Sequence, residues 1–229
     1  MNRCPCPAST GAPASAPSTA AAVVPTELLK RGQRLLEPDV YRTCLHGRAA
    51  VVKDYTRYRH TPLSLVARLL VRREARMLQR LGGWRHAPAL LGTLGGLALG
   101  MEFIPGDTLS DSASYVGREV FDQLQAALNK LHSAGITHND LHGTNVLVSA
   151  GVPVLIDFTA AWQAPRWLRN SLIARQLRRG DRANLLKLRQ RLTGLAPTPE
   201  QARLAAEPAW IRRLRQAWKQ CYRSLKGGR

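Results

Sequence analysis

The sequence predicts an α+β protein in two lobes, because strand-like segments come first along the chain and helical patterns follow. Its 229 residues suffice for one domain with a core or for a minimal pair of lobes. Hydrophobic residues make up 45% of the chain, a share typical of globular proteins. We expect the first lobe at residues 26–104 and the second at residues 105–229.

Residues 1–25 precede these lobes and differ from them in composition. They are rich in alanine, proline, serine and threonine and nearly uncharged. Such a segment cannot bury enough apolar surface to offset its chain entropy, so we expect a disordered tail.

The first lobe begins with β-like segments. Val40–Leu45 and Ala49–Tyr55 are rich in β-branched and aromatic residues and flank a glycine turn, which predicts a hairpin. A helical pattern follows over Ser64–Leu81. Glycines within the apolar run Leu90–Phe103 favour two strands over one helix. The stripe of the helix is expected to follow one of two lines, with arginines on the other face: Leu65, Leu69 and Arg73, or Val66, Leu70, Met77, Leu78 and Leu81.

The second lobe follows a chain break at Pro105-Gly106. Apolar residues at helical spacing predict a helix over Val116–His132. Val146–Ser149 and Val152–Ile156 read as two short strands. From Trp167 onward the pattern is helical and very basic.

The charge balance indicates an anionic partner. Lysine and arginine number 34 against 15 acidic residues, a net charge of +19, which suits a nucleotide, a nucleic acid, a phosphorylated glycan or an acidic membrane surface. No apolar run reaches the length of a membrane span, and the N-terminus lacks the pattern of a signal peptide. The cysteines show neither zinc-ligand spacing nor a disulfide framework, so we expect a cytoplasmic protein. They are Cys4, Cys6, Cys44 and Cys221.

One polar constellation carries the chemistry. His138-Asn-Asp-Leu-His-Gly-Thr-Asn145 precedes a predicted strand, and a second strand then leads to Asp157-Phe158. In this order the residues resemble the catalytic and metal-binding loops of the protein-kinase-like superfamily. The alternative is a polar turn with a chance Asp-Phe at a strand end. The resemblance extends from about Val40 to Leu192 and implies a two-lobed kinase-like fold with a shortened second lobe.

The resemblance assigns roles that the chemistry of phosphoryl transfer requires. Asp140 would orient the acceptor hydroxyl and accept its proton. Asn145 and Asp157 would supply hard oxygen ligands to Mg²⁺ beside ATP. Lys53, at the end of a predicted strand, would hold the nucleotide phosphates, and Glu74 would orient Lys53 through an ion pair. The alternatives are a solvated strand lysine and a helical pairing of Glu74 with arginine neighbours.

Two further segments match the superfamily less specifically. Met101-Glu102-Phe-Ile104 resembles the segment between kinase lobes, where the backbone of Glu102 and Ile104 would read adenine and Met101 would line the pocket. The alternative is a strand followed by a turn. Asp181 matches a buried aspartate that braces the catalytic loop, although a helix N-cap or a solvated acid fits as well.

Several departures point away from eukaryotic-type protein kinases. Asn139 replaces arginine, Thr159 replaces glycine in the metal loop, and no glycine-rich phosphate loop precedes Val40. These traits resemble the compact bacterial lipopolysaccharide-core kinases, which act on Kdo or heptose, and the RIO-type kinases.

The acceptor expected from this resemblance is a sugar hydroxyl of an anionic glycolipid. Peripheral contact with the anionic inner membrane face would suit such a substrate, and no specific nucleic acid is expected. A RIO-like protein serine/threonine kinase and a pseudokinase that only binds ligands are the alternatives.

Overall fold

The computed structural model describes residues 27–112 and 117–206, which form two compact units. One unit runs through Ser112 and also takes in Thr144–Ala161, and the other contains the chain on either side of that insertion. The expected N-terminal tail lies outside the described residues, and so does Val116, the expected start of the second-lobe helix. The lobe limits expected from the sequence stay a prediction.

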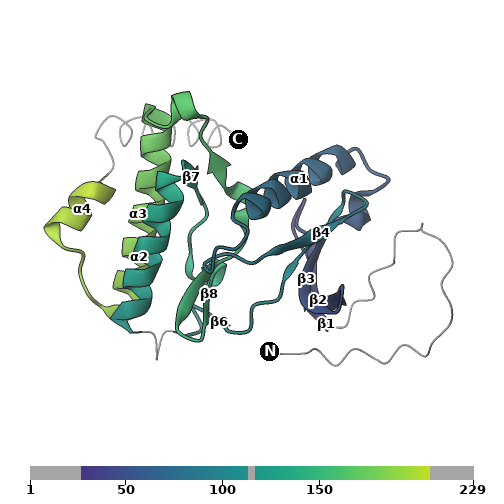
Figure 1. Ribbon diagram of the computed structural model, residues 1–229, viewed down its shortest axis with the longest axis horizontal. Helices are drawn as coiled ribbons and strands as arrows, with labels where there is room; N and C mark the ends of the chain where they lie inside the picture. Colours follow the sequence, from purple (N-terminus) through teal and green to yellow (C-terminus); the bar gives the residue numbers. More distant parts are fainter. Residues whose placement is uncertain (1–26, 113–116, 207–229) are drawn as a thin grey trace, which may run out of the picture. The chain divides into compact units, whose positions relative to one another are not determined.

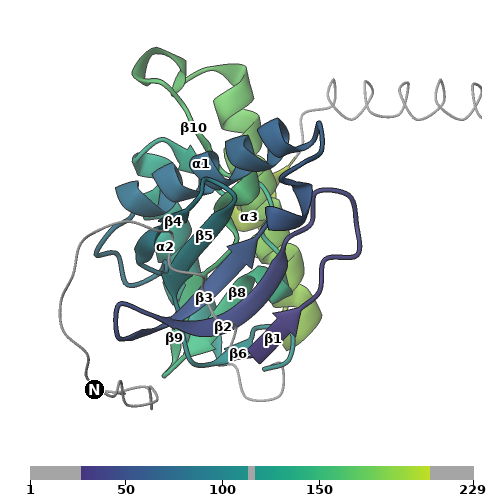
Figure 2. The ribbon, with the colours of Figure 1, turned by 90° about the vertical axis from the view of Figure 1, so that its right-hand side faces the viewer.

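A five-stranded antiparallel sheet builds the first unit (Figures 1 and 2). Its order is β1-β2-β3-β5-β4, and the hairpin of β2 with β3 confirms the expected pairing. His46 and Gly47 connect these strands with φ values of 52° and 73°, the left-handed conformation that a tight two-residue hairpin turn needs. The strands are β1 (Glu27–Lys30), β2 (Asp39–Leu45), β3 (Arg48–Asp54), β4 (Leu90–Leu94) and β5 (Ala98–Glu102).

Helix α1 (Ser64–Arg80) lies beside this sheet and confirms the expected helix. The expected stripe is wrong at its start, because Leu65, Val66 and Leu69 are exposed. The helix instead buries the face of Ala67, Val71, Glu74, Met77 and Leu78. Glu74 lies on that buried face, where a charge requires a partner.

A three-stranded sheet in the order β6-β8-β9 completes the first unit. The two later strands confirm the expected pair, whereas β6 is too short to show a sequence pattern. His86 ties β9 to the segment before β4, since its backbone oxygen accepts from the Leu155 amide at 2.8 Å. The elements are β6 (Asp107–Thr108), η2 (Gly143–Asn145), β8 (Val146–Ser149), β9 (Val152–Leu155) and η3 (Phe158–Ala160).

The second unit is mostly helical. Helices α2 and α3 pack against each other (Figure 1). Each buries apolar side chains, Leu124 and Leu128 in α2 and Leu185 in α3. The helical pattern expected from Trp167 is interrupted, because Gly194 ends α3 with a φ of 70° and Thr198 caps α4. The elements are α2 (Arg118–Ser133), β7 (Ile136–Thr137), β10 (Trp162–Gln163), η4 (Arg166–Leu168), α3 (Leu172–Thr193) and α4 (Pro199–Ala205). Among the described helices, none is long and apolar enough to cross a membrane. A short 3-10 turn, η1 (Thr56–Tyr58), follows β3 in the first unit.

Candidate active site

Lys53 lies between two carboxylates in the first unit. Its ammonium is 2.7 Å from Glu74 Oε1 and 2.8 Å from Asp157 Oδ1. The Glu74 side chain is only 1% exposed, and the ion pair with Lys53 compensates for its lost hydration. The structure thus brings together a strand lysine, a helix glutamate and a loop aspartate that are far apart in the sequence.

The neighbouring charges shift the pKa values of Lys53 and Asp157. Burial lowers the pKa of Lys53, but the negative charges of Glu74 and Asp157 outweigh it and raise the pKa above its ordinary value. Burial raises the pKa of Asp157, yet Lys53 and hydrogen bonds from Lys53 and Thr159 lower it to about 2. Lys53 is therefore a cation and Asp157 an anion at neutral pH.

Asn145 and Asp157 belong to the same unit as Lys53. Asn145 ends η2 and is buried, and its backbone oxygen accepts from the Ile156 amide at 3.0 Å, next to Asp157. One carboxylate and one amide oxygen are hard ligands of the kind Mg²⁺ prefers, with nucleotide phosphates and water completing its shell. The donor set fits that ion. No cluster of three or more His, Cys, Asp or Glu side chains suited to a metal exists among residues 27–112 and 117–206.

The expected adenine-reading segment lies at the end of β5. Met101 pairs with Val51 and Leu99 pairs with Lys53, so Met101 shares one sheet face with Lys53. Glu102 forms two hydrogen bonds with Ala89. The Glu102 amide donates to the Ala89 oxygen at 2.9 Å, and the Glu102 carboxylate accepts from the Ala89 amide at 3.2 Å. Adenine contacts at Glu102 and Ile104 stay a prediction.

The connection between β1 and β2 is held by side chains. Arg57 donates to the Gly32 oxygen at 2.8 Å and to the Glu37 oxygen at 2.7 Å. The Glu37 carboxylate accepts from the amides of Gln33 and Arg34, both at 2.9 Å. A Cβ on Gly32 would collide with the Glu37 backbone oxygen, so only glycine fits this close approach. Specific contacts therefore shape the connection that lacks a glycine-rich sequence.

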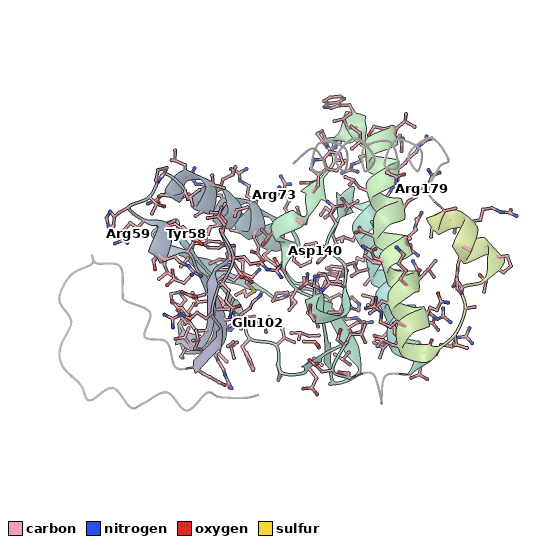
Figure 3. The ribbon with its side chains drawn as sticks, turned by 180° about the vertical axis from the view of Figure 1, so that it is seen from behind. Tyr58, Arg59, Arg73, Glu102, Asp140 and Arg179 are labelled. Atoms are coloured by element: carbon pink, nitrogen blue, oxygen red, sulfur yellow. The ribbon has the colours of Figure 1, made fainter. Side chains whose placement is uncertain are left out.

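Asp140 lies in the second unit, in the segment that follows β7 (Figure 3). Its side chain is 50% exposed and lies 3.5 Å from His142 Nε2. An exposed carboxylate on a held backbone can act on an incoming hydroxyl.

Asp181 holds that backbone. Its fully buried carboxylate accepts from the amides of His138 at 2.9 Å and Asn139 at 2.8 Å. His132 Nε2 lies 2.9 Å away and donates, since a carboxylate can only accept. Asn139 has a φ of 65°, a left-handed conformation that asparagine tolerates better than most residues. The structure therefore favours a bracing role for Asp181 over an N-cap or a solvated acid.

Three residues in these contacts escaped sequence reasoning. Thr159 was noticed only as a departure from glycine, yet its hydroxyl lies between Glu74 and Asp157. Arg73 received no functional role, but its guanidinium donates to the oxygens of Ala160 and Ala161. His132 carried no signal beyond its place at the end of a helix.

Comparison with known protein families identifies the family of this chain. The model of the RIO domain matches residues 40–178, more than half of the chain. The chain belongs to the RIO domain family. RIO domains are part of the protein-kinase-like superfamily, so the expected fold and superfamily are confirmed.

The chain is also similar to two curated proteins. A probable bifunctional tRNA threonylcarbamoyladenosine biosynthesis protein of Methanothermobacter thermautotrophicus is 32% identical over 147 residues, 62% of this chain and 26% of the relative. The serine/threonine-protein kinase RAD53 of Saccharomyces cerevisiae is 36% identical over 66 residues, 26% of this chain and 8% of that kinase. This RIO chain thus spans about a quarter of the first relative and far less of the second.

These matches bear on the expected acceptor. They support an ATP-using, kinase-type protein and favour the RIO-type alternative over a lipopolysaccharide-core sugar kinase. Nothing in them supports a glycolipid acceptor or contact with a membrane.

Proposed function

We propose that this RIO domain is an ATP-dependent phosphotransferase that acts on a protein serine or threonine hydroxyl. The observation that carries the proposal is the Lys53 ammonium, held between Glu74 and Asp157 at 2.7 and 2.8 Å. A buried, permanently charged lysine beside a carboxylate and an amide oxygen suits the phosphates of a nucleotide with Mg²⁺. The yeast relative's name as a serine/threonine-protein kinase supports the acceptor class.

In this proposal each residue has a separate role, set by its charge or by its ability to accept a proton. Lys53 binds the nucleotide phosphates, and Glu74 keeps its ammonium oriented. Asp157 and Asn145 would hold Mg²⁺, which when bound neutralises charge on the phosphates. Asp140 accepts the proton of the acceptor hydroxyl while the hydroxyl oxygen bonds to the γ-phosphorus and ADP leaves. Met101 lines the site of the base.

Asp140→Asn tests the assignment of the base. The variant retains the shape of the side chain but cannot accept the proton, so kcat should fall by about 10²-fold or more while ATP affinity stays near that of the wild type. The measurement is phosphate transfer from labelled ATP with Mg²⁺ to a mixed protein acceptor, beside calorimetric titration of a non-hydrolysable ATP analogue. Asp122→Asn is the matched control, since Asp122 is an exposed residue of α2.

The two measurements distinguish a catalytic role of Asp140 from a structural one. Wild-type turnover in Asp140→Asn would contradict a base at this position, and lost ATP affinity would assign Asp140 a structural role. Running glycolipid acceptors in parallel distinguishes a sugar kinase. An absence of transfer to any acceptor, with ATP still bound, would favour the pseudokinase.

A second candidate rests on the archaeal relative. Its name places it in tRNA threonylcarbamoyladenosine biosynthesis, and the match covers 62% of this chain. We infer that ATP hydrolysis in support of a tRNA-modifying protein is the second candidate, and the net charge of +19 suits a tRNA partner. Stimulation of ATP hydrolysis by tRNA, compared with an equal mass of heparin, would support it.

A further inference from the structure

One hydroxyl links the two carboxylates that flank Lys53. Thr159 Oγ1 lies 2.6 Å from Asp157 Oδ1 and 3.0 Å from Glu74 Oε2. The Thr159 amide also donates to Asp157 Oδ1, at 3.3 Å. Thr159 comes two residues after Asp157 and lies 85 positions from Glu74, so this hydroxyl joins the metal-binding segment to α1.

Glu74 depends on this hydroxyl because its side chain is buried. Its two oxygens have separate partners, Oε1 bonding to Lys53 and Oε2 accepting from Thr159. A buried carboxylate oxygen that loses its donor carries the full cost of its lost hydration. A glycine or valine at position 159 would supply no such donor.

A second contact joins the same two segments. Arg73, which precedes Glu74 in α1, donates through Nη2 to the Ala161 oxygen at 2.8 Å and to the Ala160 oxygen at 3.2 Å (Figure 3). Consecutive residues of α1 therefore bind consecutive parts of the segment that begins at Asp157. The two contacts act at different atoms, so each can be removed alone.

We propose that Thr159 is a positioning residue. Its hydroxyl, supported by Arg73, connects α1 to the segment that begins at Asp157, and we call this connection the latch. The latch holds the Lys53–Glu74 pair in place before any nucleotide binds. The inference rests on the proposed function, since it assigns Thr159 a role in nucleotide binding. Without the hydroxyl, Glu74 and Asp157 lose a shared donor, and Lys53 is presented to the phosphates less often in its productive orientation.

Thr159→Val and Thr159→Ser separate the hydroxyl from the rest of the side chain. Valine retains the branched shape without the donor, whereas serine retains the donor without the methyl group. Thr159→Val should weaken binding of a non-hydrolysable ATP analogue with Mg²⁺ about tenfold and raise KM for ATP similarly, with a smaller change in kcat. Thr159→Ser should stay within about twofold of the wild type.

Calorimetric titration measures the affinity, and circular dichroism checks that each variant folds. Arg73→Ala should weaken binding in the same direction, and Arg72→Ala, an exposed neighbour on α1, should not. If Thr159→Val fails to fold, the comparison of Arg73→Ala with Arg72→Ala still tests whether the contacts between α1 and the Asp157 segment support nucleotide binding.

The titrations distinguish failure of the proposed function from failure of the latch. Wild-type protein that binds no nucleotide overturns the proposed function and the latch together. Wild-type binding with an unchanged Thr159→Val overturns the latch alone. Equal weakening in the valine and serine variants also overturns it, because packing of the methyl group would then explain the loss.

Discussion

Asp157 shows how one side chain depends on its neighbours for its charge. It caps η3 with a φ of 62°, and its carboxylate accepts from Lys53 and from Thr159. These contacts outweigh burial and lower its pKa from 3.8 to about 2. A group whose pKa is lower in the folded state stabilises the fold above its ordinary pKa, and this stability is lost as pH falls toward 2.

Lys53→Met should therefore raise the pKa of Asp157. Methionine retains an unbranched chain but removes the cation, so the carboxylate loses its main source of stabilisation while its burial remains. Acid unfolding should then begin at a higher pH than in the wild type. The measurements are an NMR titration of the Asp157 carboxyl carbon and the pH dependence of unfolding.

Lys30→Met is the matched control for this titration. It makes the same change in net charge, and Lys30 pairs with Glu37 rather than with Glu74 or Asp157. An Asp157 pKa that is equally low in both variants would show that Lys53 does not set it.

At the scale of elements, α3 holds the backbone of the segment that carries Asp140 through hydrogen bonds. The Asp181 carboxylate accepts from His132 of α2 and from two consecutive amides after β7. A helix, a neighbouring helix and a loop thus meet at one buried charge. Because three donors share this acceptor, its loss would leave several buried polar groups unsatisfied.

Asp181→Asn tests this brace. The amide group that replaces one carboxylate oxygen faces a donor, so we expect the free energy of unfolding to fall by about 2 kcal/mol or more. Hydrogen exchange should quicken most at the amides of His138 and Asn139. Asp122→Asn on α2 serves as the control. Unchanged protection of both amides would mean that another group holds the loop.

At the scale of the whole molecule, 34 basic residues face only 15 acidic ones, which leaves an excess of 19 positive charges (34 − 15). Four arginines of α1 are exposed, and α3 adds exposed or half-buried ones, so like charges repel one another along both helices. Raising the salt concentration from about 20 to about 300 mM shortens the screening length and should raise the melting temperature by a few degrees.

A variant with Arg76→Glu and Arg80→Glu should respond less. Each substitution lowers the net charge by two, so the total falls from +19 to +15. Differential scanning calorimetry at several salt concentrations gives the comparison. A melting temperature that falls with salt in the wild type would show that screened ion pairs outweigh repulsion. Peripheral membrane binding, which the charge also suggested, stays a prediction.

The sequence by itself determined the α+β class and the principal strands and helices. It also named candidate site residues whose roles stay predictions: Lys53, Glu74, Asp140, Asn145 and Asp157. Local spacing suffices for these because helical and strand periodicities are short-range, and because phosphoryl transfer demands particular residue types in a particular order. The superfamily resemblance could not choose among acceptors, since no fixed motif marks them.

Only the tertiary structure decided which face of α1 is buried and which distant groups meet. Leu65 and Leu69 fit a helical stripe as well as Ala67 and Val71 do, and packing against the rest of the unit selects between them. The contacts of Thr159 with Glu74 and of His132 with Asp181 span 85 and 49 positions of the chain. Such pairings depend on the folded path of the backbone, which no local pattern encodes.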